Sequence, residues 1–467
     1  MSTQEFDVCV IGAGPGGYVA AIRAGQRGLS TAIVEKNHFG GTCLNIGCIP
    51  TKTLIAGTEV LHHARHAADF GVDITGKISP NWTKMMARKN EVVGKLRGGI
   101  ASLLKAAGVT TFNGAAGFID RTSIMVSGGS DNGAVIKAKN FILTTGSESL
   151  VPGFIPKAAN VITSTELLDI DHIPSSLLIL GGGVIGCEFA CLFAELGTQV
   201  TIVEMLPSIM PNIDREISGV VAKQMQAAGV KIMTGTPLSD IKATAKGVSG
   251  KVGGETVSAE YLLVSIGRKA VTAGLNPAAA GIKLNERGWI PVDEHCRTNV
   301  PGIYAIGDIG GKIWLAHLAS AMALCAVDNI CGKRNEFNYD LIPGCIFTSP
   351  EIGSLGLSEE QCKERGIAYR VGKFPFAALG KAMAINDTVG MVKIIADQNT
   401  DQVLGMHIVG PHATDLIAEA GPAMKLEITA AELGNVVHAH PTIGEAIMEA
   451  AHAVHGDCCH LPCRKKK

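Results

Sequence analysis

Residues 6–17 decide the fold of the first part of the chain; they read Phe-Asp-Val-Cys-Val-Ile-Gly-Ala-Gly-Pro-Gly-Gly. A short apolar strand runs directly into a Gly-x-Gly-x-x-Gly turn, a helical pattern continues to about Gly28, and a second strand over 31–34 ends in Glu35. The first glycine permits a tight turn, the second lets a pyrophosphate approach the backbone, and the third lets the helix pack on the strand. The helix N-terminus attracts the anion, and the carboxylate binds ribose hydroxyls. This stretch therefore predicts a Rossmann-like dinucleotide-binding domain.

The same pattern returns between residues 177 and 204. An apolar strand precedes Gly181-Gly182-Gly183-Val184-Ile185-Gly186, a helix runs to about Gly197, and the next strand ends in Glu204. The spacing from the first glycine to the acid is 23 residues in both copies. One such motif also occurs for packing alone, but two in matching context predict two Rossmann-like domains in an α/β protein. Glu204 favours NAD over NADP, because a 2′-phosphate there would meet a like charge.

Bulk properties narrow the class of protein. A chain of 467 residues with 57 glycines and 46% hydrophobic residues suits about two to four α/β domains. The net charge is −1 and only Arg464-Lys465-Lys466-Lys467 forms a basic run, which argues against nucleic-acid binding. No apolar run approaches the length of a membrane span, and no basic segment precedes the first strand. We expect a cytoplasmic protein that has no contact with a membrane.

Thirteen cysteines are present, and an odd number argues against a disulfide framework. Most lie in apolar stretches and are expected to be buried, namely Cys9, Cys187, Cys191, Cys325 and Cys345. Cys43 and Cys48 differ, because they stand in Gly40-Gly41-Thr42-Cys43-Leu44-Asn45-Ile46-Gly47-Cys48-Ile49-Pro50-Thr51-Lys52. A helix start and a nearby cation both stabilise thiolate, so this pair is predicted to be reactive. Two buried thiols are the alternative interpretation of the bare spacing.

A second cluster, His438-Ala439-His440-Pro441-Thr442-Ile443-Gly444-Glu445, supplies groups for proton transfer. Thiol–disulfide exchange needs a group that takes a proton from one thiol and returns it to another, and histidine suits that task near neutral pH. A carboxylate on the far imidazole nitrogen would orient such a base. From the residues alone, His438 and Glu449 are neighbouring alternatives to His440 and Glu445.

The phrase at 40–52, the segment Thr298-Asn299-Val300-Pro301-Gly302-Ile303-Tyr304-Ala305-Ile306-Gly307-Asp308 and the phrase at 438–445 together resemble the pyridine nucleotide–disulfide oxidoreductase family. The resemblance covers about residues 5–455. It implies an FAD-binding domain (1–148), an NAD-binding domain (149–270), a central domain that completes the FAD site (271–346) and a C-terminal α+β dimerisation domain (347–467) with a Cys-rich tail (457–467).

The resemblance also implies the roles of the chemical groups. Cys43 and Cys48 would form a redox-active disulfide, with Cys48 against the flavin and Cys43 exchanging with the substrate. Lys52 would lie by the flavin and pair with Glu188, which is otherwise an unexplained acid in an apolar helix. His440 would be the acid–base group, oriented by Glu445, and would reach the disulfide of the neighbouring subunit. The homodimer would then be obligatory.

The cofactor residues follow from the motifs and the resemblance. For FAD we expect Gly12, Gly14, Gly17, Glu35, Lys36, Thr42, Lys52, Ala116, Thr145, Gly146, Ser147, Asp308, Trp314, Leu315, Ala316 and His317. For NAD we expect Gly181, Gly183, Val184, Ile185, Gly186, Glu204, Leu238 and Gly267. No metal site is expected.

Within the family, Glu204 and the phrase Cys-Leu-Asn-x-Gly-Cys-Ile-Pro-x-Lys favour enzymes that oxidise protein-bound dihydrolipoamide with NAD⁺. The implied partner is a lipoyl-bearing carrier: the E2 component of a 2-oxoacid dehydrogenase complex, the glycine cleavage H protein or a free-standing lipoate-binding protein. Mercuric reductase is the alternative activity, because it also carries a vicinal cysteine pair near its C-terminus, as Cys458-Cys459 does here; it lacks the histidine base. A FAD-binding scaffold without catalysis is the alternative of another class.

Two segments depart from the family pattern. Leu318 stands where the family usually has lysine, and Ala321 and Met322 stand where acids are common, so an unusually apolar exposed helix side is expected. In the tail, Cys458, Cys459 and Cys463 have a spacing that matches no closed tetrahedral zinc motif. We expect a flexible tail without a metal.

Overall fold

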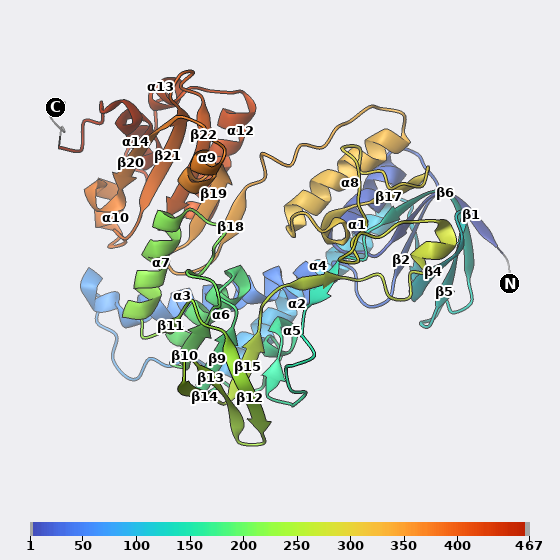
Figure 1. The fold of residues 1–467 in the computed structure, drawn as a ribbon, viewed down its shortest axis with the longest axis horizontal. Coiled ribbons are helices and arrows are strands. Elements are labelled where there is room, and N and C mark those ends of the chain that lie inside the picture. Colours follow the sequence, from blue (N-terminus) through green and yellow to red (C-terminus); the bar gives the residue numbers. More distant parts are fainter. Residues whose placement is uncertain (1–2, 463–467) are drawn as a thin grey trace. The chain divides into compact units, whose positions relative to one another are not determined.

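The computed structural model describes residues 3–462, and Figure 1 shows the course of the chain. Cys463 and the basic run at 464–467 lie outside the described residues. The chain folds into two compact units. The first contains the segments up to Pro152, Thr163–His172 and Gly267–Asn338, and the second contains Gly153–Ile162, Ile173–Ile266 and the chain from Tyr339 onward.

The first unit is built on a seven-stranded sheet in the order β3-β2-β1-β6-β5-β4, with β17 on β6. Strands β1, β2, β3, β6 and β17 pair in parallel, and β5 joins β4 and β6 in antiparallel pairing. Residues 8–11 are buried throughout, as expected of a parallel strand covered on both faces. The strands are β1 (Gln4–Ile11), β2 (Thr31–Glu35), β3 (Thr110–Asn113), β4 (Ala115–Asp120), β5 (Ser123–Ser127), β6 (Val135–Leu143) and β17 (Ile303–Ala305).

Helices carry the cofactor turn and the cysteine pair of this unit. Helix α1 (Pro15–Gln26) follows β1 directly and packs against α8 (Ala316–Ile330). The cysteine phrase forms α2 (Gly41–Ile46) and α3 (Cys48–Arg65), and α4 (Trp82–Ala106) packs on both. The short strands β7 (Ser147–Ser149) and β16 (Arg268–Ala270) pair in antiparallel orientation, and α5 (Ser164–Leu167) belongs to the same unit.

The second unit begins with a parallel sheet in the order β11-β10-β9-β15-β8. Helix α6 (Val184–Glu195) follows β9 through the second glycine turn, and α7 (Arg215–Ala227) follows β10. The parallel strands are β8 (Val161–Ile162), β9 (Ser176–Leu180), β10 (Gln199–Val203), β11 (Lys231–Met233) and β15 (Tyr261–Val264). An antiparallel sheet of β12 (Leu238–Thr244), β13 (Gly247–Val252) and β14 (Glu255–Ala259) adds to the core of this region.

The C-terminal part of the second unit is a five-stranded antiparallel sheet in the order β18-β19-β22-β21-β20. Helix α14 (Glu445–His455) packs on β20 and β21 over a core that includes Phe374, Ile394 and Ile447. The strands are β18 (Gly344–Ile346), β19 (Ile352–Gly356), β20 (Tyr369–Pro375), β21 (Met391–Asp397) and β22 (Val403–Val409); the smaller helices are α9 (Glu359–Glu364), α10 (Gly380–Ala384), α11 (Ala413–Leu416), α12 (Ala420–Lys425) and α13 (Ala430–Gly434).

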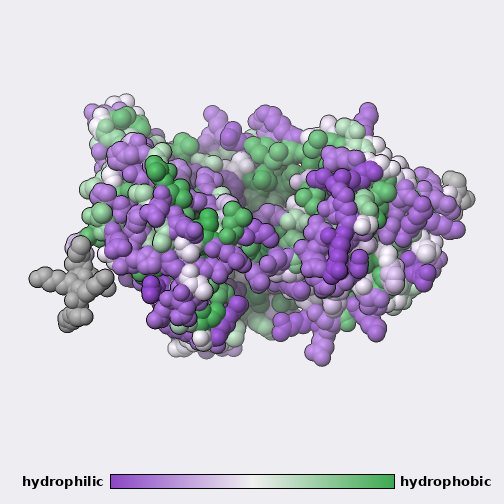
Figure 2. Space-filling model, turned by 90° about the horizontal axis from the view of Figure 1, so that it is seen from above, coloured by the Kyte–Doolittle hydropathy of each residue, from purple (hydrophilic) through white to green (hydrophobic). Residues whose placement is uncertain are grey.

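This architecture confirms the predicted fold class, two Rossmann-like domains followed by an α+β domain. Hydrophilic residues predominate on the face shown in Figure 2, with smaller hydrophobic areas between them. Among residues 3–462, no helix combines the length and the apolar character that crossing a bilayer requires.

Two expectations about exposed segments were wrong. Leu318 and Met322 are each only 1% exposed, because this side of α8 faces the interior; only Ala321 of that apolar trio lies at the surface. The described part of the tail, residues 457–462, is held against α14. Cys458 is buried and donates a hydrogen bond to Glu449 at 2.9 Å, and His460 lies 2.6 Å from the same carboxylate. Cys9, Cys187 and Cys325 are buried as predicted, whereas Cys191 and Cys345 are half-buried.

Candidate active site

The first glycine turn leaves room where a phosphate would need it. Gly12 has φ +98°, and a Cβ there would lie 2.4 Å from the Thr144 carbonyl oxygen; a Cβ on Gly17 would lie 2.0 Å from the carbonyl oxygen of Gly12. Both positions therefore exclude any side chain. At Gly14, in contrast, the nearest atom to an added Cβ is 3.9 Å away. This open space lies at the N-terminus of α1, where free N–H groups attract an anion.

The second turn repeats that arrangement. Gly181 has φ +108°, and a Cβ there would lie 2.6 Å from the Ser265 carbonyl oxygen; a Cβ on Gly186 would lie 2.2 Å from the carbonyl oxygen of Gly181. A Cβ added at Gly183, in contrast, would meet no atom within 4 Å. Val184 and Ile185 form the first turn of α6. In both copies, the middle glycine therefore has open space on the side where the motif predicts the pyrophosphate of a dinucleotide.

The two acids also occupy equivalent positions. Glu35 accepts hydrogen bonds from the backbone N–H groups of Ala13 (2.7 Å) and Asn37 (2.8 Å). Glu204 accepts them from Gly182 and Leu206, both at 2.8 Å. Each carboxylate is therefore fixed at the end of its strand with lone pairs left for two ribose hydroxyls. A cavity of about 320 Å³ adjoins Glu35; its lining includes Asn37, His38, Arg97 and Asn113.

Asp308 belongs to a partly buried network in the first unit. Its carboxylate accepts a hydrogen bond from Ser147 Oγ at 2.5 Å, and Arg268 donates to Ser147 Oγ at 2.6 Å and to the Ser147 carbonyl at 2.7 Å. Burial raises the pKa of Asp308, against the hydrogen bond from Ser147 and the charge of Arg268. This network fixes the carboxylate that the sequence predicts to bind the ribitol hydroxyls of a flavin.

The remaining expected cofactor residues lie in both units. In the first, Thr145 Oγ1 donates to the carbonyl of Val271 at 2.6 Å, and Trp314 stacks on Trp289 with ring centroids 5.6 Å apart. Leu315 and Ala316 lie at the start of α8. Ala116 is buried on β4 and Gly146 is half-buried. The exposed residues among those predicted for FAD include His317, Lys36 and Thr42. Gly267 has φ +143°. In the second unit, the Leu238 side chain is buried in the core, which leaves only its backbone for NAD.

Cys43 and Cys48 meet where two helices join. A Cβ on Gly47 would lie 2.9 Å from the Thr42 carbonyl oxygen, so a glycine is needed at the break between α2 and α3. Cys48 is the first residue of the 18-residue helix α3, where the helix dipole stabilises negative charge. The two thiols are hydrogen-bonded to each other; this bond and burial raise the pKa of Cys43, and the charge of Lys52 acts in the opposite direction.

His440 and Glu445 form a pair in the second unit. His440 Nδ1 lies 2.8 Å from Glu445 Oε1, and the Thr442 N–H donates to Glu445 Oε2 at 2.8 Å. Burial alone would raise the pKa of Glu445, but the bonds from His440 and Thr442 outweigh it and keep the pKa low. The His440 side chain is 78% exposed, whereas that of His438 is 9% exposed and pairs with Glu419. His440 is therefore the imidazole that is free to meet a substrate.

Residues 6–323 match the pyridine nucleotide–disulphide oxidoreductase family, and residues 342–451 match the dimerisation domain of that family. The chain belongs to the pyridine nucleotide–disulphide oxidoreductase family. Enzymes of this family use FAD and NAD, and the open glycine turns, the two ribose acids and Asp308 fit these cofactors. The match to the dimerisation domain supports a homodimer.

Relatives cover the whole chain. The dihydrolipoyl dehydrogenase of Chlamydia trachomatis is 42% identical over 466 residues, which are 99% of this chain and all of the relative. That of Bacillus subtilis is 41% identical over 98% of this chain and 99% of its own, and that of Pisum sativum mitochondria is 39% identical over 98% and 93%. Among solved structures, LpdA from Mycobacterium tuberculosis has a TM-score of 0.89 at 27% identity, covering 96% of this chain and 99% of its own. The flavoprotein disulfide reductase RclA from Escherichia coli has a TM-score of 0.86 at 29% identity, and the match covers 95% of this chain and 99% of that one.

Arg268, which belongs to the network around Asp308, was not among the residues predicted from the sequence, although an arginine directly after Gly267 and an apolar strand is a detectable signal. Glu188, 5% exposed, accepts a hydrogen bond from the Phe347 N–H at 2.9 Å. The pairing of Lys52 with Glu188 stays a prediction.

Proposed function

We propose that this oxidoreductase is a dihydrolipoyl dehydrogenase, which oxidises protein-bound dihydrolipoamide and reduces NAD⁺. The observation that carries the proposal is the hydrogen-bonded pair of Cys43 and Cys48 at the start of α3, in the same unit as the flavin turn and Asp308. The names of the full-length relatives support the same substrate. Thiol–disulfide chemistry needs such a pair, an exposed base and an electron acceptor.

The exchange begins with Cys43 and Cys48 joined as a disulfide. A thiolate of dihydrolipoamide attacks Cys43 Sγ, the disulfide breaks, and Cys48 leaves as a thiolate at the positive end of α3. The second thiol of the substrate then attacks the mixed disulfide, so that lipoamide leaves as a cyclic disulfide and Cys43 receives the sulfur electrons. Lys52, one helical turn beyond Cys48, adds positive charge to this position. Bound FAD supplies the acceptor that passes the electron pair of the dithiol on to NAD⁺.

His440 accepts the proton of the first attacking thiol, and the proton of the second passes to Cys43 as that sulfur leaves the mixed disulfide. Glu445 holds Nδ1, which directs Nε2 outward and stabilises the positive charge that forms on the imidazole. The His440 side chain is 78% exposed, and Val437, three residues earlier in the chain, is 93% exposed; such exposure suits a segment that a second subunit covers. We propose that His440 of one subunit serves the cysteine pair of the other, so that the active sites are shared and the dimer is required for activity.

The partner is proposed to be a lipoyl-bearing carrier: an E2 component, the glycine cleavage H protein or a free-standing lipoate-binding protein. A cytoplasmic location is proposed because the thirteen cysteines are odd in number and lie mostly in apolar stretches, which does not fit the disulfide framework of a secreted protein. Mercuric reduction is not favoured, because Cys458 is buried against Glu449 and only Cys459 of that vicinal pair is exposed.

Turnover assays test the proposal. Flavin-loaded protein should reduce NAD⁺ with dihydrolipoamide, and Cys43→Ser should abolish this while FAD stays bound; Cys331→Ser, which removes an exposed cysteine elsewhere, is the control and should keep the rate. Near-normal lipoamide turnover by Cys43→Ser, or reduction of Hg²⁺ by NAD(P)H without lipoamide turnover, would contradict the assignment.

A further inference from the structure

A second thiol pair lies in the first unit, away from the cysteine phrase in the sequence. Cys296, fully buried, stands in the loop before β17, and Cys325, 2% exposed, stands in α8. The two thiols are hydrogen-bonded to each other. Cys296 has φ +63°, a conformation that L-residues other than glycine adopt at a cost. The fold therefore holds this thiol against Cys325 despite backbone strain.

The two sulfurs have different surroundings. The hydrogen bond from Cys296 lowers the pKa of Cys325, and the Asn329 side-chain amide donates to Cys325 Sγ at 3.5 Å. The same bond raises the pKa of Cys296, with burial acting in the same direction. The Asn329 amide would stabilise a thiolate at Cys325, and Cys296 is the thiol that donates to it. A nucleophilic thiolate with a protonated thiol beside it is the arrangement from which a disulfide forms.

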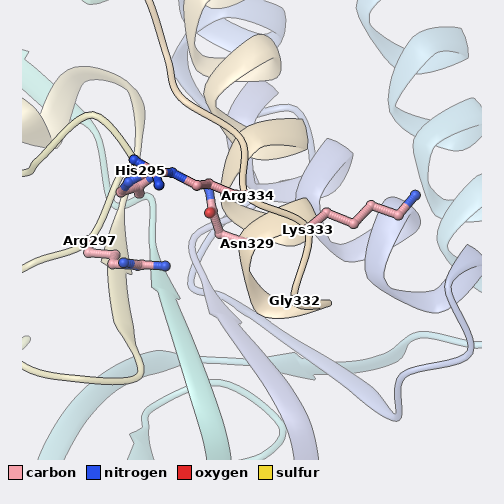
Figure 3. Close-up of a pocket in the computed structure, with 6 residues that line it drawn as sticks. All are labelled: His295, Arg297, Asn329, Gly332, Lys333 and Arg334. Atoms are coloured by element: carbon pink, nitrogen blue, oxygen red, sulfur yellow. The ribbon is translucent and has the colours of Figure 1, made fainter.

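A cavity lies beside residues that neighbour this pair in the chain or contact it (Figure 3). Its volume is about 300 Å³, and its lining is His295, Arg297, Asn329, Gly332, Lys333 and Arg334. His295 and Arg297 flank Cys296 in the chain, and the amide of Asn329 contacts both the cavity and Cys325 Sγ. In Figure 3 the Arg334 side chain extends toward His295, whereas Lys333 points away. The Asn329 side chain therefore connects the cavity to Cys325 Sγ.

We propose that Cys296 and Cys325 are a second oxidisable dithiol, which hydrogen peroxide entering through this cavity converts to a disulfide. The Cys325 thiolate attacks the peroxide, the O–O bond breaks, and Cys325 becomes a sulfenic acid as the released hydroxide takes a proton to form water. Cys296 then attacks the sulfenic sulfur, the S–S bond forms, and a second water leaves. Two thiols are oxidised and one peroxide is reduced. This inference does not depend on the proposed function.

The disulfide would tie the loop at 293–297 to α8, whose N-terminal end holds the expected FAD residues Leu315 and Ala316. Because it closes a long loop of the unfolded chain, the oxidised form is expected to unfold at a higher temperature than the dithiol form.

Peptide mapping of flavin-loaded protein tests the proposal. The background is the variant Cys43→Ser/Cys48→Ser/Cys331→Ser, which removes the proposed catalytic pair and the second of the two cysteines in the tryptic peptide 313–333. After peroxide treatment and alkylation, the expected product is peptide 288–297 linked to peptide 313–333, and dithiothreitol should release both. Adding Cys296→Ala should stop the link and leave a sulfenic acid on Cys325 that dimedone traps.

Cys9→Ala in the same background is the matched control, because Cys9 is equally buried, and the link should persist. The same peptides are mapped in the unmodified protein, so a variant that folds poorly does not decide the result. No 296–325 link at the peroxide dose that oxidises Cys43 and Cys48 in the unmodified protein would overturn the proposal, as would modification of Cys325 without any link.

Discussion

At the scale of single residues, the side chain that is proposed to meet substrate is held in place by its neighbours. Glu445 fixes one nitrogen of His440 and is itself fixed by the Thr442 N–H. His438 and Glu449, the alternatives open at the level of sequence, are engaged elsewhere: His438 pairs with Glu419, and Glu449 binds Cys458 and His460. The exposed imidazole and its orienting carboxylate are thereby distinguished from two similar pairs close by.

Removing this base should be costly and specific. His440→Ala is expected to lower kcat for dihydrolipoamide and NAD⁺ by about 10²- to 10⁴-fold, the usual loss for a missing acid–base group. The rate of NADH oxidation by an artificial electron acceptor should remain that of the parent protein, because this reaction needs no proton transfer from a thiol. His438→Ala is the matched control and should cost less than about tenfold. Equal losses in the two variants would argue for a structural rather than a chemical role.

Arg268 should matter for flavin retention. It holds both the hydroxyl and the carbonyl of Ser147, which in turn holds Asp308. Arg268→Met is expected to weaken FAD binding by about tenfold or more, because charged hydrogen bonds contribute about 1.5–3 kcal/mol. The control is Lys269→Met, which lies on the same strand as Arg268 and removes an exposed ion pair with Glu148. Equal FAD affinities, measured by fluorescence titration of the apoprotein, would exclude this role.

At the scale of elements, the glycine turns join fold and binding in one short segment. The outer glycines of each turn have no space for a side chain, whereas the middle ones face open space. The second turn shows the difference most clearly. Gly183 has φ −73°, and a Cβ added there would meet no atom within 4 Å, whereas a Cβ added at Gly186 would clash with the carbonyl of Gly181.

Substituting the two glycines of this turn should therefore give different outcomes. Gly183→Ala should keep the free energy of urea unfolding within about 1 kcal/mol of the parent value and raise KM for NAD⁺ by at least about tenfold, since its methyl group enters the proposed pyrophosphate space. Gly186→Ala should lower that free energy by more than about 2 kcal/mol, because the helix must shift. An unchanged KM in Gly183→Ala would place the pyrophosphate elsewhere.

The elements also show what sequence could predict. Both glycine turns and their acids were predictable because the motif is local and each residue has one mechanical task. The buried side of α8 was not: Leu318 and Met322 look exposed by comparison with a lysine and an acid in relatives, and only tertiary packing shows which face turns inward. Arg268 was missed because its partners, Ser147 and Asp308, are distant in the chain. The attachment of the tail to Glu449 is a contact of the same nonlocal kind.

At the scale of the whole molecule, a buried charge cluster joins the NAD-binding region to the C-terminal domain inside the second unit. Lys393 of β21 lies 2.8 Å from Asp214, which caps α7, and 2.8 Å from Glu359 of α9. The side chains of Lys393 and Asp214 are 2% and 0% exposed. Removing one member of such a pair leaves an uncompensated buried charge.

Lys393→Met is expected to lower the free energy of unfolding by about 3–5 kcal/mol in urea titrations. The exposed neighbour Lys373, which pairs with Glu216, gives the control: Lys373→Met should cost less than about 1 kcal/mol. A loss of less than about 1 kcal/mol for Lys393→Met would mean that this cluster does not contribute to the stability of the fold.

The cluster also predicts a pH dependence. Burial alone would raise the pKa of Asp214, but Lys393 outweighs it and holds the pKa below the ordinary value of 3.8. Its contribution to stability is therefore complete above that value and is lost as the pH falls through the lowered pKa. Asp214→Asn should lose stability at neutral pH and show a flatter decline on acidification, measured by urea unfolding at several pH values. A decline as steep as that of the parent protein would contradict this origin.

The central claim, that Cys43 and Cys48 are the redox partner of the flavin, is tested most directly by anaerobic reductive titration of flavin-loaded protein with dihydrolipoamide, followed by flavin absorbance. The parent protein should take up one electron pair per chain in the disulfide and a second in FAD. Cys48→Ser should leave FAD bound and unreduced by dihydrolipoamide. Reduction of that variant's flavin by dihydrolipoamide, at the rate of the parent protein, would contradict the account.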